Sequence, residues 1–245
     1  NSSLIPGIAS QRMKVMILQS APRFGLAEDN LNAIRALLGE RRADLLVLPE
    51  LCLSGYQMKN REEAMRFAEP SDGPTMQALA KLADGLAGAL LAGVAGRVGP
   101  RVYNSAALVD GGGTRAVYRK VHLFGGEKHC FDPGQEPFRV HALGGVRLVI
   151  MICFDWIFPE AARSLAVQGA QLIAHPANLV LPWCQEAMRT RALENRVFCL
   201  TSNRVGTESR VEGQVLRFTG GSQAVGPDGA LLGRAGDSEA ELLEF

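Results

Sequence analysis

The stretch RLVIMICFDWIFPE, residues 147–160, indicates the fold class more clearly than any other part of the sequence. An apolar, strand-like run ends at Cys153, a short turn follows, and Pro159 and Glu160 are typical of a helix first turn. Proline loses no hydrogen bond there, and an acidic side chain faces the positive end of the helix dipole. Strand, cysteine, turn and helix in this order predict an α/β protein in which the thiol projects at the end of a sheet, and the backbone N–H of Phe154 could bind an oxyanion. From this stretch alone, a buried structural cysteine is about equally consistent.

Working outward, short apolar runs alternate with helical patterns through most of the chain. Besides 146–152, strands are expected at residues 14–18, 44–48, 90–98, 105–109, 172–175 and 198–202. Helices are expected at 29–42, 75–86, 159–167 and 182–196, and the Gly-rich residues 207–245 predict antiparallel strands and hairpins. The pattern predicts one α/β domain over residues 13–245, with helices covering a mixed sheet system. Residues 1–12 are expected to be a native arm or a cloning remnant without a function.

Composition excludes several classes of protein. The 245 residues carry 26 basic and 25 acidic side chains, so the net charge of +1 gives no reason to expect a nucleic-acid partner. No apolar run is long enough to cross a bilayer, and the N-terminus lacks the pattern of a secretory signal. A charge near zero permits self-association. Five cysteines without a CxxC pair favour free thiols in a reducing cytoplasm over disulfides or a zinc site.

Glu50 is the first further candidate for chemistry. It ends the segment LLVLPE, residues 45–50, in which an apolar strand leads directly to a carboxylate. A carboxylate at the end of a buried strand is costly unless it is partnered or used, and strand ends of α/β sheets face the functional crevice. The alternative, a solvated residue at a strand end, is favoured when this segment is considered alone.

Lys120 is the second candidate, because it ends a strand expected to begin near Gly113 and could stabilise a developing negative charge. The alternative is a surface lysine. Glu127 lies in the loop that follows and is more often a surface residue at such a place. His122 and His129 lack a third ligand at metal-site spacing, so no metal is expected.

The three reactive types complement one another. A thiolate is the reactive form of cysteine, a carboxylate can accept the thiol proton, and an ammonium can stabilise the charge that develops later. The sequence contains neither a GxSxG elbow nor a P-loop. His175 could partner Cys153, but it lies inside an apolar strand, where a hydrogen-bonded core residue is the more common outcome.

Three segments together resemble a known family: PELCLSGY, RKVHLFGGEKHCF and ICFDWIFPE match the ordered motifs of the nitrilase superfamily of carbon–nitrogen hydrolases. The resemblance covers residues 13–245, and HPANLV and CFDW are most similar to hyperthermophilic archaeal aliphatic nitrilases. It implies a four-layer α-β-β-α sandwich and usually dimers joined through helical faces. Relatives usually continue beyond ELLEF with a tail that crosses the dimer; whether that tail is truncated here stays open, and the difference bears on assembly more than on chemistry.

The same resemblance implies roles for individual residues. Glu50 would be the general base, Lys120 the transition-state stabiliser and Cys153 the nucleophile, and Glu127 would position substrate and assist proton transfer. No cofactor is implied, and the expected substrate is a small amide or nitrile. The reaction would pass through a thioester on the cysteine.

The pocket wall is expected to contain Tyr56, Trp156 and Asn178, each of which lies just past a motif at the exit end of a strand. Plain core packing is an equally good explanation for these three. Two rival functions stay open: an N-carbamoyl amidohydrolase or ω-amidase with the same residues, and a catalytically silent scaffold on the same fold.

Overall fold

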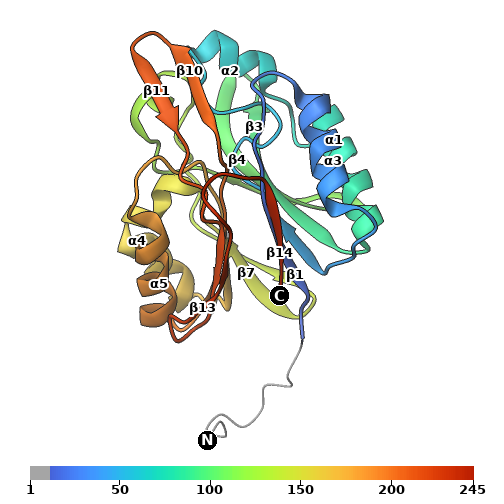
Figure 1. The fold of residues 1–245 in the computed structure, drawn as a ribbon, viewed down its shortest axis with the longest axis vertical. Coiled ribbons are helices and arrows are strands. Elements are labelled where there is room, and N and C mark those ends of the chain that lie inside the picture. The colour runs from blue at the N-terminus through green and yellow to red at the C-terminus, as the bar shows by residue number, and fades with distance from the viewer. Residues whose placement is uncertain (1–11) are drawn as a thin grey trace, which may run out of the picture.

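Two six-stranded sheets form the centre of the protein in the computed structural model, which describes residues 12–245 (Figure 1). The first sheet has the order β14-β1-β2-β3-β4-β5, with β1, β2 and β3 parallel and the other pairs antiparallel. Its strands are β1 (Val15–Gln19), β2 (Leu45–Val47), β3 (Ala89–Val98), β4 (Arg101–Asp110), β5 (Gly113–Arg119) and β14 (Glu241–Glu244).

The second sheet has the order β13-β12-β9-β8-β7-β6, with β7, β8 and β9 parallel at its centre. Its strands are β6 (Val140–Leu143), β7 (Val146–Ile150), β8 (Leu172–Pro176), β9 (Phe198–Ser202), β12 (Gln223–Val225) and β13 (Leu231–Arg234). A separate hairpin joins β10 (Thr207–Val211) to β11 (Gln214–Arg217).

Alternation of side chains along the strands produces the layers. In β1, Ile17 packs into the apolar cluster between the sheets, whereas Met16 packs against the helices on the outer face. The outer helices of the first sheet are α1 (Ala27–Leu38) and α3 (Pro74–Leu86), and α4 (Pro159–Val167) and α5 (Cys184–Asn195) cover the second sheet (Figure 1). The expected α-β-β-α sandwich is therefore confirmed.

Most predicted elements are present, with shifted ends. The strand at 198–202 and the helix at 159–167 have the predicted bounds. The helix expected at 29–42 ends at Leu38, because Gly39 adopts φ +55 and terminates it. Helix α2 (Arg61–Phe67) was not predicted; it has only seven residues and is capped by the Asn60 side chain, which accepts from Glu63 N. The expected N-terminal arm lies outside the described residues, except for Arg12.

The ends of the parallel strands determine where functional side chains can meet. Strands β2 and β3 of one sheet and β7, β8 and β9 of the other lead into loops at one end of the sandwich. The 3-10 helix η2 (Cys153–Ile157) lies in the loop after β7, and a second, η1 (Gly125–His129), lies in the loop after β5. Among the residues described, no helix combines the length and the apolar character needed to span a bilayer.

Candidate active site

Glu50 lies three residues after β2 and is completely buried. The backbone of β3 approaches it so closely that a Cβ on Gly93 would lie 2.3 Å from the Glu50 Cα. Asn178, two residues after β8, donates its side-chain N–H to the Glu50 carbonyl at 2.8 Å. Both sheets therefore fix the backbone that carries this carboxylate.

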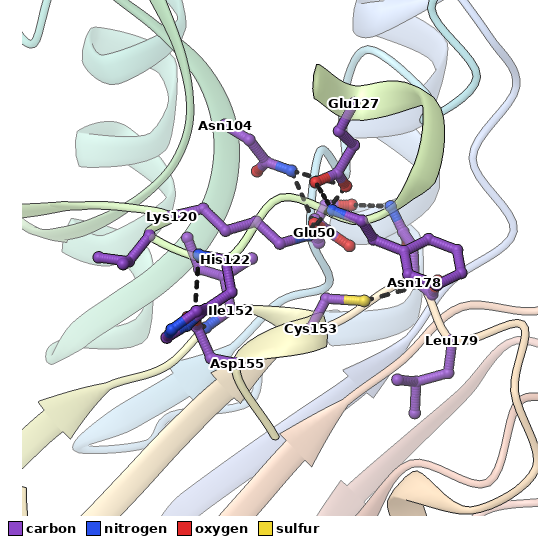
Figure 2. Close-up of polar contacts among 12 residues, drawn as sticks. Glu50, Asn104, Lys120, His122, Glu127, Ile152, Cys153, Asp155, Asn178 and Leu179 are labelled. Carbon is purple, nitrogen blue, oxygen red and sulfur yellow. Dashed lines mark hydrogen bonds and ion pairs between the residues drawn. The ribbon is translucent and has the colours of Figure 1, made fainter. Parts of the chain in front are cut away.

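A buried polar cluster forms around Lys120, the residue that follows β5. Its Nζ lies 2.6 Å from Glu50 Oε1 and 2.8 Å from Glu127 Oε1, and both carboxylates are buried with it (Figure 2). Asn104 in β4 donates to the same two oxygens, at 2.7 and 3.3 Å. Glu127 Oε2 accepts from the backbone N–H of Phe124 at 3.0 Å. No group in residues 12–245 donates to Glu50 Oε2, so that oxygen is free to exchange a proton.

The electrostatics of the cluster separate the two kinds of group. Burial raises the pKa of Glu50 from 4.5 to about 7; the Lys120 ammonium opposes this and the Glu127 carboxylate adds to it. For Lys120, burial acts to lower the pKa, but Glu127 and Glu50 outweigh it and hold the pKa above 10.5. The site therefore combines a carboxyl group that titrates near neutral pH with an ammonium that stays charged.

Cys153 begins η2 in a strained backbone conformation. Its φ of +40° lies in the left-handed region, which costs a non-glycine residue about 1–3 kcal/mol and persists only where the surroundings enforce it. The thiol donates to the Asn178 carbonyl at 3.8 Å, and His175 Nε2 lies 2.9 Å from the Cys153 carbonyl. Burial lowers the pKa of His175 to about 4, so the imidazole is neutral at pH 7 and donates from Nε2.

The Cys153 thiol belongs to the same electrostatic environment as the cluster. Burial and the Glu50 carboxylate raise the pKa of the thiol well above 9.0, with Lys120 opposing. The resting side chain is therefore a neutral thiol. Cys153 is 5% exposed and Glu127 is 6% exposed, which places the site just beneath the surface. Figure 2 shows Glu50, Lys120 and Glu127 gathered beside the elbow that carries Cys153.

The four residues expected in or near a pocket occupy different environments. Tyr56 is buried, and burial raises its pKa well above 10.0, with the Glu127 and Glu50 carboxylates adding to the effect. Asn178 contacts both Glu50 and Cys153. Phe154 is half-buried and its ring lies 5.0 Å from that of Phe124. Trp156 is buried in an apolar cluster that includes residues of β7, α4 and α5, and no polar contact joins it to the other site residues in the described structure.

Comparison of the sequence with known protein families identifies the family of this chain. A profile described as carbon-nitrogen hydrolase matches residues 9–244. The chain belongs to the carbon-nitrogen hydrolase family.

The names of individual similar proteins are consistent with this family. The hydrolase is 41% identical to a nitrilase of Pyrococcus abyssi over 94% of this chain and 87% of that protein. It is 37% identical to an (R)-stereoselective amidase of a Pseudomonas species over 93% of this chain and 82% of that protein. The expected likeness to the nitrilase superfamily and to an archaeal nitrilase is therefore confirmed.

A solved structure shows the same architecture as the hydrolase. A mutant of the Nesterenkonia sp. AN1 amidase, in which acrylamide has added to the active-site cysteine, matches with a TM-score of 0.81 and 31% identity. The match covers 95% of this chain and 92% of that one. The family implies a catalytic cysteine in this hydrolase as well.

Two polar contributors to the candidate site were not predicted from the sequence. Asn104 was overlooked although Asn and Ser interrupt the apolar strand VYNSAALV, and a polar side chain inside a buried strand needs a partner. Asp155 was not predicted, because the segment that contains its partners Tyr118 and His122 lies more than thirty residues away in the sequence. His175 was expected to be a hydrogen-bonded core residue, which is what the structure shows.

A surface cavity of about 650 Å³ lies at the opposite end of the strands. Asp44 before β2, Ala89 at the start of β3 and Asp110 at the end of β4 help to line it. None of the buried polar cluster reaches it, so its volume says nothing about the hydrolase chemistry.

Proposed function

We propose that the chain hydrolyses the carbon–nitrogen bond of a small amide or nitrile through a thioester on Cys153. The observation that carries this proposal is the contact of buried Lys120 with Glu50 and Glu127, next to a thiol held on a strained elbow. A permanent charge is costly to bury, and its two carboxylate partners offset that cost only in this arrangement. Structural purposes alone do not require a titrating carboxylate and a thiol at the same place.

Glu50 is the general base of the proposed cycle. With a pKa of about 7, it is ionised in a large fraction of molecules at neutral pH, while the thiol is protonated. Its unpartnered Oε2 takes the thiol proton as sulfur bonds to the amide or nitrile carbon. Glu50 then gives this proton to the departing nitrogen. The C–N bond of an amide breaks to leave a thioester, whereas a nitrile first forms a thioimidate, which adds water and then loses ammonia to give the same thioester.

Lys120 stabilises the negative charge of the tetrahedral species. Its Nζ is already oriented by two carboxylates, so it needs no reorganisation when charge develops on substrate. The Phe154 N–H, in the first turn of η2 where helical N–H groups lack intrahelical partners, is the second donor. Loss of one such donor typically costs about 3–4 kcal/mol of transition-state stabilisation.

Glu127 holds Lys120 in place and, in this proposal, also orients substrate and assists proton transfer. In the second half of the cycle, Glu50 takes a proton from water as the oxygen attacks the thioester. The sulfur–carbon bond breaks, the carboxylic acid leaves, and Cys153 recovers its proton. The proposed cycle needs only side chains and one backbone N–H of the chain, together with water, and no metal or organic cofactor.

Ammonia release from a panel of short amides and nitriles tests the proposal. Wild-type protein and Cys199→Ala, which removes a buried thiol in β9, should hydrolyse at least one of these substrates, and Cys153→Ala should not. Mass spectrometry of trapped protein should place the acyl group on Cys153. Undiminished turnover by Cys153→Ala would overturn the proposal.

The same assay separates the rivals. Carbon dioxide release from an N-carbamoyl substrate, without turnover of simple amides, would favour the carbamoyl amidohydrolase, and deamidation of an ω-amide alone would favour the ω-amidase. A silent scaffold would turn over none of them. Its thiol would react with iodoacetamide no faster at neutral pH than an ordinary cysteine.

We also propose that residues 13–245 form one domain and that the protein is cytoplasmic. In the cytoplasm it would associate into a dimer or a larger homo-oligomer. Exposed apolar side chains on the α4 and α5 layer support this association, among them Val167 at 76% and Trp183 at 62% exposure. All five thiols are free, as a reducing compartment would require. Light scattering coupled to gel filtration would measure the mass in solution, and a monomer would exclude the homo-oligomer.

A further inference from the structure

The Asp155 carboxylate is completely buried and accepts four hydrogen bonds. Oδ2 accepts from Tyr118 O–H at 2.8 Å and from Ile152 N–H at 2.8 Å. Oδ1 lies 2.7 Å from His122 Nδ1 and accepts from His122 N–H at 3.3 Å. Figure 2 shows His122, Ile152 and Asp155 together below Lys120 and beside Cys153.

These contacts join the two segments that carry the reactive groups. Tyr118 precedes Lys120 by two residues and His122 follows it by two, whereas Ile152 directly precedes Cys153. A carboxylate that only capped η2 would need the Ile152 N–H alone. Three of the four contacts instead reach a segment that lies more than thirty residues away in the sequence. Their arrangement ties the position of the ammonium to that of the thiol.

Each partner is itself held from a second side. The Tyr118 hydroxyl also accepts from Val121 N–H at 3.3 Å, in the residue after Lys120. The His122 ring stacks on Phe158, with centroids 3.8 Å apart and planes 20° apart. Asp155 N–H donates back to the Ile152 carbonyl at 3.0 Å. The network is thus a rigid connection rather than a set of exposed polar contacts.

We propose that Asp155 is a positioning residue, whose carboxylate sets the spacing between the Lys120 ammonium and the Cys153 thiol through Tyr118, His122 and the Ile152 N–H. This inference rests on the proposed roles of Lys120 and Cys153. All four contacts come from N–H or O–H groups of three residues, so the site requires an acceptor on both oxygens. An asparagine of the same shape places an NH₂ against one pair of donors. The elbow and the Lys120 segment then lose their common attachment.

Asp155→Asn should lower kcat by about 10²-fold with KM little changed, because displacement by about 1 Å has an effect of that size on a chemical step. The matched control is Asp132→Asn, which removes a carboxylate that accepts from Val102 N–H and Arg61 outside the site. It should retain wild-type kcat. Circular dichroism and thermal unfolding of both variants establish that the proteins compared are folded.

Conservative variants extend the test to the partners and serve if Asp155→Asn does not fold. Tyr118→Phe keeps the ring and removes only the O–H, and it should lower kcat less than Asp155→Asn does. His122→Asn keeps an N–H near the Nδ1 position and should retain more activity than His122→Ala. In the Asp155→Asn, Tyr118→Phe cycle, the second substitution should have a smaller effect on kcat than it has in wild type.

The readouts distinguish the two hypotheses. If Cys153→Ala is inactive and both Asp155→Asn and Tyr118→Phe keep wild-type kcat, the positioning role is wrong and the proposed function stands. Equal activities of His122→Asn and His122→Ala would also count against the network. If Cys153→Ala retains full activity, the proposed function itself fails. If the loss of kcat in each variant is fully explained by the fraction of that protein that is unfolded, Asp155 has a structural role and the positioning proposal is wrong.

Discussion

Asn104→Ala should shift the pH dependence of hydrolysis without removing any reacting group. Asn104 donates to Glu50 Oε1 at 2.7 Å and is one of the groups that hold down the pKa of that carboxyl. In the proposed cycle Glu50 must be ionised to accept the thiol proton, so kcat/KM falls as the pH drops through its pKa. Without Asn104, the ionised form is less stable, and a higher pH is needed to reach it.

The size of the effect follows from the burial of the pair. A hydrogen bond to a buried charged group contributes about 1.5–3 kcal/mol, and about 1.4 kcal/mol corresponds to one pKa unit. Loss of the Asn104 amide should therefore raise the pKa of Glu50 from about 7 to about 8–9. At pH 7 the variant should be roughly 5- to 50-fold less active than wild type, in which about half of Glu50 is ionised, and its activity should recover as the pH is raised.

The measurement is kcat/KM from roughly pH 5 to pH 10, a range that includes the acid limb of both the wild-type protein and the variant. The substrate is whichever amide or nitrile the wild-type protein hydrolyses. The matched control is Asn32→Ala, which truncates an exposed asparagine on α1. It should keep the wild-type profile. Structural damage in Asn104→Ala would lower activity at every pH, whereas the electrostatic effect is reversed at high pH. An acid limb at the wild-type midpoint in Asn104→Ala would refute the reasoning.

Three further predictions concern backbone approach and buried ionisable groups. Gly93→Ala should abolish activity and lower the unfolding free energy by about 1–3 kcal/mol, because its Cβ would meet the Glu50 backbone, whereas Gly85→Ala on α3 has open space and should be neutral or stabilising in urea titrations. Burial lowers the pKa of His175 to about 4 in the folded protein, against 6.5 in the unfolded chain, so the folded state loses stability as the pH falls from 6.5 to 4. Burial raises the pKa of Glu50 to about 7 in the folded protein, against 4.5 in the unfolded chain, so the folded state loses stability as the pH rises from 4.5 to 7. Glu50→Gln keeps only the His175 effect and His175→Gln keeps only the Glu50 effect, so between pH 4 and pH 7 the unfolding free energy of Glu50→Gln should rise relative to that of His175→Gln by a few kcal/mol. Parallel curves of unfolding free energy against pH would contradict these pKa values. Glu208→Gln should cost about 3–5 kcal/mol in thermal or urea unfolding, because it leaves a buried arginine without its carboxylate partner, and an unchanged midpoint would show that the pair contributes nothing.

The sequence by itself determined the layers and the chemical types at the site. Apolar runs of strand length and helices with one apolar face are local patterns, and the buried faces they predict are the ones observed in β1, β9 and α4. The short helix α2 escaped prediction because its seven residues are too few to show a periodic face. Glu50 and Cys153 could be singled out because each follows a buried apolar strand, where a polar group needs a reason to be present, whereas Lys120 follows a largely unburied strand and was supported by the resemblance of its motif to the family.

Only the tertiary structure decided how these groups are arranged. Asn104 and Asp155 make their decisive contacts with residues 23 to 54 positions away, so no local pattern could reveal them. The pKa of Glu50 depends on burial together with Lys120 and Glu127, which belong to other segments. Residue type sets which hydrogen bonds and charges a side chain can offer, but the dielectric environment and the partner at 2.6 Å exist only once both sheets have packed.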